Sequence, residues 1–274
     1  MNEKSKRVGF IGAGNMATAL IKGVISSGLY NPDMINAYDT DPEKLKSIYE
    51  TYKVEGRQSS SDLVKSCNTV ILAVKPQVMN IVLEEIKGEV TKDHIIISIA
   101  AGIKINTIQS FLGNNVPVIR VMPNTPALIQ MGVSAVAAGE KVTPEQMNVA
   151  IEILKAVGIA FTVDEVMMDA VTAVSGSGPG FVFKIMECFV EAAEKQGFEK
   201  ETAIKMVVQT FLGASKLAES SDLSLSDLRK MVTSPGGTTE AGLKFLDTNK
   251  LGELIDGTIE TAKKRSIELG NPTK

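Results

Sequence analysis

Cysteine and histidine are scarce in this sequence of 274 residues, and tryptophan is absent. The two cysteines, Cys67 and Cys188, stand far apart and lack the spacing of metal ligands. Neither a disulfide framework nor a zinc site is therefore expected, and both thiols are interpreted as small buried hydrophobes. The only histidine, His94, precedes the apolar run IIISIA at the expected start of a strand. Ligands bind at the opposite end of such strands, so His94 is not a candidate catalyst.

Excess basic charge and long apolar runs are also missing. The formal net charge is −3, so binding to nucleic acid or to an anionic membrane is not expected. No apolar stretch approaches the roughly 20 residues that span a bilayer. The start MNEKSKRVGFIGAGNMATALI resembles a signal peptide, but Gly12, Gly14 and Asn15 interrupt it and no small-residue cleavage site follows. A soluble, cytoplasmic protein is expected.

Two periodicities divide the chain. Residues 7 to 163 alternate apolar runs such as RVGFIG, TVILAV and HIIISIA with amphipathic segments. This alternation predicts an α/β fold with a doubly wound, mostly parallel sheet. From residue 164 long segments with helical periodicity take over, so this part is predicted to be all-α. The length favours two domains, 1–163 and 164–274.

The predicted helices of the second domain have broad apolar faces that about 110 residues could hardly bury alone. These faces carry Phe181, Ile185, Phe189, Ile204, Val207, Val208 and Phe211. Two interpretations stay open: an ordinary helical core, and a core shared between the subunits of a dimer.

A glycine-rich turn follows the first predicted strand, in the motif Gly12-x-Gly14-x-x-Ala17. Gly12 permits the tight turn, Gly14 lets the backbone approach a pyrophosphate, and Ala17 allows close contact between helix and strand. Amides at the start of a helix can then face the phosphates. The motif predicts a dinucleotide site, with a purely structural turn as the alternative. The predicted cofactor contacts are Gly12, Ala13, Gly14, Asn15 and Met16.

Asp39 ends the second predicted strand. A carboxylate there can accept hydrogen bonds from the adenosine ribose hydroxyls, and it repels a 2′-phosphate. Taken alone, Asp39 favours NAD over NADP. The alternative is a surface aspartate that caps the following helix, at Asp41 or nearby.

Two further loops follow predicted strands and should line the cofactor, because ligands bind outside the carboxyl ends of strands in open α/β sheets. Small side chains in the second loop leave room for a nicotinamide ring. These loops contain Ala73, Val74, Lys75 and Pro76, and Ala100 and Ala101.

Many hydroxy-acid dehydrogenases require a histidine as acid-base catalyst, and the only histidine of this chain, His94, is not a candidate for that role. A reaction that needs no strong protein acid is therefore favoured. Reduction of a cyclic imine is such a reaction, because the nitrogen is readily protonated in solution and the enzyme mainly has to position it against the hydride.

The stretch VTSPGGTTEAG, residues 232–242, places a polar loop before a helix. Amides at the helix start carry partial positive charge and could bind a substrate carboxylate. Thr238 could instead be the N-cap of an ordinary turn, but Ala241 three residues later is neither Glu nor Gln, so no capping box is expected. The candidate substrate residues are Ser234, Gly236, Gly237, Thr238 and Thr239. A second glycine cluster, SGSGPG at 175–180, serves either close helix packing or a ligand.

These segments resemble pyrroline-5-carboxylate reductase. The likeness spans essentially the whole chain and rests on GFIGAGNMATALIKG, LAVKPQ, SIAAGI, RVMPNTPALI, DAVTAVSGSGPGFVF and LRKMVTSPGGTTEAGLKFLD. It implies an N-terminal Rossmann domain and a helical domain that dimerises by interleaving helices, often within a ring of dimers. The implied reaction is hydride transfer from NADH or NADPH to 1-pyrroline-5-carboxylate, which gives L-proline.

The resemblance also implies roles for individual residues. Ser234 and the amides near Gly237 and Thr239 would hold the substrate carboxylate, and the Thr239 hydroxyl would bond the ring nitrogen. Lys75, Pro76, Ala100 and Ala101 would line the nicotinamide, with Asn124 nearby. The partner subunit would complete the site, so an isolated monomer should be inactive.

Two positions depart from the family pattern. Members that prefer NADPH often have Asn-Arg or Ser-rich loops after the second strand, whereas this chain has Asp39-Thr40-Asp41, which leaves the cofactor preference open. Ser60 stands where members often have an asparagine near the adenosine.

Two alternative functions stay open beside the reduction of a cyclic imine. One is a β-hydroxyacid dehydrogenase that uses Lys184, although Glu187 and Cys188 stand where an asparagine is expected. The other is a non-catalytic dinucleotide-binding protein.

Overall fold

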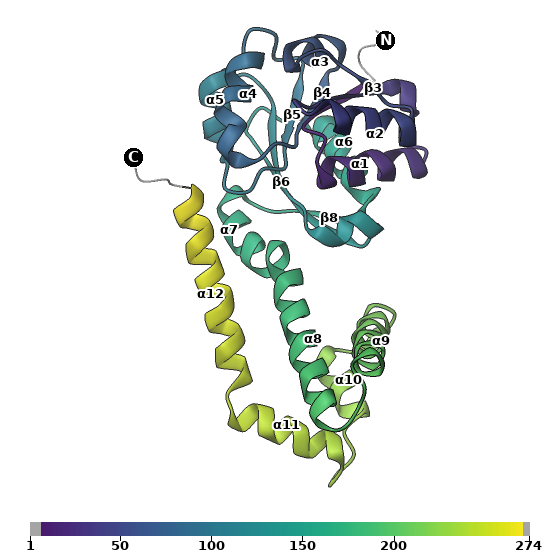
Figure 1. Ribbon diagram of the computed structural model, residues 1–274. Coiled ribbons are helices and arrows are strands. Elements are labelled where there is room, and N and C mark those ends of the chain that lie inside the picture. Colours follow the sequence, from purple (N-terminus) through teal and green to yellow (C-terminus); the bar gives the residue numbers. More distant parts are fainter. Residues whose placement is uncertain (1–6, 271–274) are drawn as a thin grey trace. The chain divides into compact units, whose positions relative to one another are not determined.

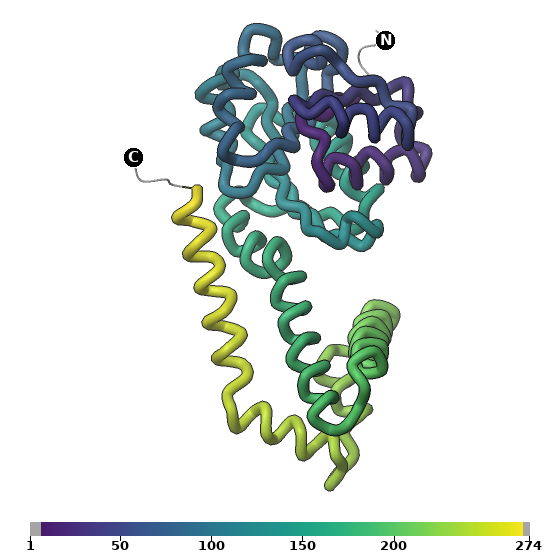
Figure 2. The backbone as a smooth tube through the Cα atoms, in the orientation of Figure 1, coloured from purple at the N-terminus to yellow at the C-terminus, as the bar shows by residue number. Residues whose placement is uncertain are grey.

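A computed structural model describes residues 7–270, and the chain divides into two compact units (Figure 1, Figure 2). The first unit contains the chain up to Ser177 together with the segment from Ala262 onward, and the second is Gly178–Thr261. Among the described residues, no helix is long and apolar enough to cross a membrane.

The first unit is built around one eight-stranded sheet with the order β3-β2-β1-β4-β5-β6-β7-β8. Only β6 and β7 pair antiparallel; every other neighbouring pair is parallel. The strands are β1 (Val8–Ile11), β2 (Ile35–Tyr38), β3 (Glu55–Gly56), β4 (Thr69–Leu72), β5 (Ile95–Ser98), β6 (Val118–Met122), β7 (Gly132–Ala138) and β8 (Gly158–Thr162).

Helices cover both faces of this sheet, and a separate apolar core lies under each layer. One core joins Phe10 of β1 to Leu20 of α1 and Ile153 of α6, and the other joins Val70 of β4 to Leu83 of α4. Strands buried on both faces read as continuous apolar runs, as β1, β4 and β5 do. The doubly wound fold predicted from the sequence is confirmed. The helices are α1 (Asn15–Ser26), α2 (Pro42–Tyr52), α3 (Ser60–Ser66), α4 (Met79–Ile86), α5 (Ile105–Leu112), α6 (Pro144–Lys155) and α7 (Met168–Val171).

A short π-helix, η6 (Thr172–Gly176), follows α7 and ends in the first two residues of the cluster SGSGPG. The amide of Ser177 donates to the carbonyl of Thr172 at 2.7 Å. A Cβ on Gly176 would lie 2.4 Å from the end of the Met122 side chain, which is flexible enough to move away. Gly178 and Gly180 have open space where a Cβ would stand.

The second unit is entirely helical, as predicted. Helices α8 and α9 pack together, and the rings of Phe189 and Phe211 meet edge to face at 5.4 Å. The helices are α8 (Gly178–Lys195), α9 (Lys200–Glu219), α10 (Leu225–Met231), α11 (Thr238–Thr248) and α12 (Leu251–Gly270), the last of which ends in the first unit.

Most apolar side chains of the second unit are exposed within a single chain. Val207 is buried, but its neighbour Val208 is 47% exposed, and Phe189 is 54% exposed. An ordinary helical core is therefore not what the described chain contains. Cys188 is exposed as well, so the expectation of a buried thiol is wrong there: it lies on α8, which has no buried residue of its own.

Cys67 is buried, as expected. The amide nitrogen of Asn36 donates a hydrogen bond to its sulfur at 3.1 Å, and the Arg57 guanidinium donates to the Asn36 carbonyl oxygen at 2.8 Å. Burial raises the pKa of Cys67 to about 11, against a usual 9.0, even though the Asn36 bond opposes the shift. The thiol is thus held protonated.

We expect Cys67 to be nearly inert in the folded protein. In a Cys188→Ser variant at about pH 8, alkylation by iodoacetamide should be roughly 100-fold slower in the native than in the urea-unfolded state, because the thiolate is that much rarer. Since the folded pKa is raised, the stability contributed by this thiol is complete below pH 9 and lost as the pH rises towards about 11. Equal alkylation rates in the two states would contradict the assignment.

Candidate functional site

The glycine-rich turn connects β1 to α1. Gly12 has φ +99°, and a Cβ there would lie 2.6 Å from the carbonyl oxygen of Ala73, so only glycine fits. Its amide donates to the carbonyl of Tyr38 at 2.7 Å. Gly14 is the N-cap of α1, and no side chain caps that helix. An uncapped helix start is a suitable site for an anion such as a pyrophosphate.

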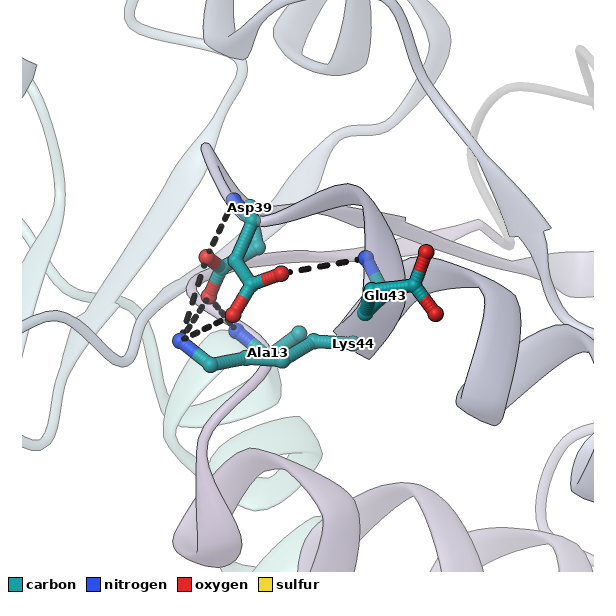
Figure 3. A network of polar contacts seen from close by, with 5 residues as sticks. Ala13, Asp39, Glu43 and Lys44 are labelled. Carbon is teal, nitrogen blue, oxygen red and sulfur yellow. Dashed lines mark hydrogen bonds and ion pairs between the residues drawn. The ribbon is translucent and has the colours of Figure 1, made fainter.

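Asp39 holds this turn in place, as Figure 3 shows. Its Oδ2 accepts a hydrogen bond from the amide of Ala13 at 2.8 Å, and its Oδ1 accepts one from the amide of Asp41 at 2.9 Å. The Lys44 ammonium donates to both oxygens, at 3.3 Å and 3.4 Å. Asp41 caps α2 by accepting from the amide of Glu43 at 3.0 Å, as one of the sequence alternatives stated.

The charge of Asp39 is stabilised by this network. Partial burial is the largest single influence and raises the pKa of Asp39, but the hydrogen bonds from Ala13, Asp41 and Lys44 together outweigh it and lower the pKa below its usual value. The carboxylate is therefore ionised at neutral pH. The sequence did not identify Lys44 as its partner, because this pairing depends on how α2 returns past the end of β2.

A cavity of about 510 Å³ lies beside the turn. It is bounded by the start of α1 on one side and by α2 on the other. Its hydroxyl, amide and ammonium groups and the uncapped helix start suit a phosphate-bearing ligand. The lining residues are Ala13, Gly14, Asn15, Thr18, Glu43, Lys44, Ser47, Ile48, Thr51, Tyr52 and Leu128.

The other predicted cofactor residues follow the neighbouring parallel strands. Leu72 of β4 pairs with Ser98 of β5, so the loops with Ala73, Val74, Lys75 and Pro76 and with Ala100 and Ala101 leave the sheet at one edge. The amide of Ala73 donates to the carbonyl of Ile11 at 2.8 Å, next to the glycine-rich turn. Ala100 is buried and Ala101 is exposed.

Ser60 and Asn124 already have partners. Ser60 is buried, and its hydroxyl donates to the Glu85 carboxylate at 2.6 Å. The Asn124 amide nitrogen donates to the carbonyl of Ser175 at 3.1 Å, and its oxygen accepts from the amide of Val133 at 2.9 Å. A ligand contact by either side chain would require a rearrangement.

The loop before α11 differs from the sequence prediction in one respect. Gly237, not Thr238, is the N-cap of α11, and Gly236 has φ +72°. The residue at the third helical position is therefore Glu240 rather than Ala241, and its carboxylate accepts from the amide of Gly236 at 2.7 Å. No capping box forms at α11, as predicted, because the N-cap Gly237 has no side chain, but the sequence did not identify the bond from Gly236 to Glu240.

The amides of the first helical residues, Thr238 and Thr239, are not capped by a side chain. The amide of Gly237 donates to the carbonyl of Ser234 at 2.9 Å, which closes the loop. This helix start can accept an anion by the same physics as the start of α1. The first unit holds every candidate cofactor residue, and the second holds every candidate substrate residue.

Lys184 and His94 have other roles. Lys184 is exposed and donates to the Glu187 carboxylate at 3.2 Å, a bond that raises the pKa of Lys184. The Nδ1 of His94 accepts from the amide of Thr91 at 3.0 Å, and its Nε2 lies 3.2 Å from the carbonyl of Val64. The histidine thus links α3 to the start of β5.

Two family models match the chain. The model described as pyrroline-5-carboxylate reductase dimerisation matches residues 165–269, which hold the predicted helical domain. The model described as NADP oxidoreductase, coenzyme F420-dependent, matches residues 7–102, which contain the glycine-rich turn.

Similar proteins and structures extend over nearly the whole chain. Pyrroline-5-carboxylate reductase of Pseudomonas aeruginosa is 41% identical over 96% of this chain and 96% of its own length, and that of Methanosarcina acetivorans is 38% identical over 97% and 99%. The Coxiella burnetii reductase structure has a TM-score of 0.92 at 38% identity and covers 97% of this chain and 98% of its own. The Plasmodium falciparum pyrroline carboxylate reductase with NADP bound has a TM-score of 0.86 at 27% identity, with coverage of 98% and 99%. The chain belongs to the pyrroline-5-carboxylate reductase family.

Proposed function

We propose that the protein reduces 1-pyrroline-5-carboxylate to L-proline by hydride transfer from NADH or NADPH, the last step of proline biosynthesis. The observation that carries this proposal is the pair of uncapped helix starts, at α1 and at α11, each suited to one anionic reactant. Relatives of that name match over nearly the full length of the chain.

Each proposed contact has a simple physical task. The turn from Gly12 to Met16 would hold the pyrophosphate, and Lys75, Pro76, Ala100 and Ala101 would line the nicotinamide. When bound, the cofactor supplies the hydride. The loop from Ser234 and the amides of Thr238 and Thr239 would hold the substrate carboxylate.

The Thr239 hydroxyl would hydrogen-bond the ring nitrogen. The hydride adds to the carbon of the C=N bond, and the electron pair of that bond goes to the nitrogen, which carries the proton already taken from solution. No strong protein acid is required, so positioning is the main contribution of the chain.

Self-association is part of the same proposal. Exposed apolar side chains on α8 and α9, including Phe183 and Phe189, would be covered by a second copy of the chain. A complete site would then need the partner, and the two predicted domains, 1–163 and 164–274, would supply its two halves. A ring of dimers and a cytoplasmic location stay predictions, as do the absence of nucleic-acid and membrane partners.

Removing one hydroxyl tests the catalytic assignment. Thr239→Val keeps the side-chain volume but loses the bond to the ring nitrogen, so kcat/KM for pyrroline-5-carboxylate should fall roughly 10- to 100-fold. Thr239→Ser, which keeps the hydroxyl, should retain most of the activity. Steady-state kinetics on the full-length oligomer measure both.

Lys184→Ala is the matched test of the dehydrogenase alternative and should leave turnover intact. If Lys184→Ala abolished turnover while Thr239→Val left it unchanged, the imine-reductase assignment would be wrong. Protein that bound NADH but oxidised none of it with this substrate would favour the non-catalytic alternative.

Cofactor choice gives a second prediction. Because Asp39 is ionised and fixed at the end of β2, we expect kcat/KM for NADPH to exceed that for NADH by less than about tenfold, or the order to reverse. Parallel kinetics with both cofactors and saturating pyrroline-5-carboxylate measure the ratio. A hundredfold advantage for NADPH would contradict this role of Asp39.

A further inference from the structure

The Asp39 carboxylate has no acceptor position left for a ribose. An ionised carboxylate offers about four lone-pair directions. Two are taken by the backbone amides of Ala13 and Asp41, and the Lys44 ammonium takes the other two (Figure 3). A ribose hydroxyl can bond this carboxylate only if one of these partners leaves.

Lys44 is the partner that can leave at low cost. The two amides belong to the glycine-rich turn and to the backbone after β2, and their bonds of 2.8 Å and 2.9 Å are short. The Lys44 contacts are 3.3 Å and 3.4 Å long, and its side chain is 46% exposed. Exposed pairs of this kind are weak, and a lysine stem is flexible.

The charged residues around the cavity indicate that Lys44 can bind a phosphate there. Among its described lining residues, Lys44 is the only cation and Glu43 the only anion. Asp39 lies against Lys44, and the Asp41 carboxylate lies 4.0 Å from the same ammonium. Without Lys44, the charged groups nearest to a phosphate in this corner would be carboxylates, and like charges repel strongly at such distances.

We propose that Lys44 admits the 2′-phosphate of NADPH beside Asp39, and so sets how far the repulsion by Asp39 excludes this cofactor. Lys44 leaves Asp39 to pair with that phosphate, while Asp39 stays bound to the two amides and braces the glycine-rich turn. With NADH, Lys44 moves aside and Asp39 accepts the ribose hydroxyls. This inference rests on the dinucleotide binding of the proposed function and not on the imine reaction.

Calorimetric titration of the full-length oligomer with NADP⁺ and NAD⁺ tests the role of Lys44. Lys44→Gln should weaken NADP⁺ binding about 10- to 100-fold, since a charge-assisted contact is lost, and should leave the Kd for NAD⁺ within about threefold. Lys46→Gln is the matched control: it removes the same charge from α2 at an exposed position outside the cavity lining, and should change neither affinity. Higher ionic strength should reduce NADP⁺ affinity more in the wild type than in Lys44→Gln.

The outcomes separate this inference from the proposed function. Equal weakening of both nucleotides in Lys44→Gln, or no weakening of NADP⁺, would overturn the role of Lys44 and leave the proposed function standing. A wild-type protein that bound neither nucleotide would overturn both.

The bracing role of Asp39 has its own readout without any ligand. Asp39→Asn places an amide group against a backbone donor, so the Tm of the free protein should fall by roughly 3–6 °C. Lys44→Gln should leave the Tm nearly unchanged, because it removes only the exposed partner. An unchanged Tm in Asp39→Asn would show that Asp39 braces nothing.

Discussion

The close approach of two strands at Gly12 is the constraint on which the nucleotide-binding edge depends. A Cβ at this position would lie 2.6 Å from the carbonyl oxygen of Ala73, so the chain must pass from β1 into α1 with no side chain at the turn. The same turn directs the amide of Ala13 at the Asp39 carboxylate. The lack of one side chain therefore sets the mutual positions of β4, the start of α1 and the end of β2.

The parts of the fold that sequence could predict are those encoded by local patterns. The apolar runs became buried strands, and the glycine motif became the expected turn, because periodicity and backbone freedom are properties of short segments. The sequence left the cap of α11 open, with Thr238 as one candidate. Side-chain preference favours threonine as an N-cap, but the backbone at Gly236 and Gly237 sets where the helix begins. The Asp39–Lys44 pair depends on how α2 returns past the end of β2, which no local pattern specifies.

In the helical half, hydrophobic periodicity predicts the apolar faces of the helices but not what buries them. It correctly indicated apolar faces, yet adjacent residues such as Val207 and Val208 differ sharply in exposure within one chain. A helical period of apolar residues indicates that one face of the helix is buried in the native protein. It does not indicate whether the same chain or a second copy buries that face. For this reason the sequence left both interpretations open. The exposure of these apolar side chains in the folded chain excludes a self-contained helical core among the described residues.

The scarcity of histidine is consistent with the use of backbone amides to bind the reactants. The single histidine, His94, contacts Thr91 and Val64 at the start of β5, away from the proposed reaction site. The proposed reactants carry a carboxylate and a pyrophosphate, which must both be bound by a chain of net charge −3. Uncapped helix starts at α1 and α11 offer positive potential without adding cationic side chains. Fixed amides also need no reorientation when the ligand arrives, so the same feature that admits each anion holds it in position for hydride transfer.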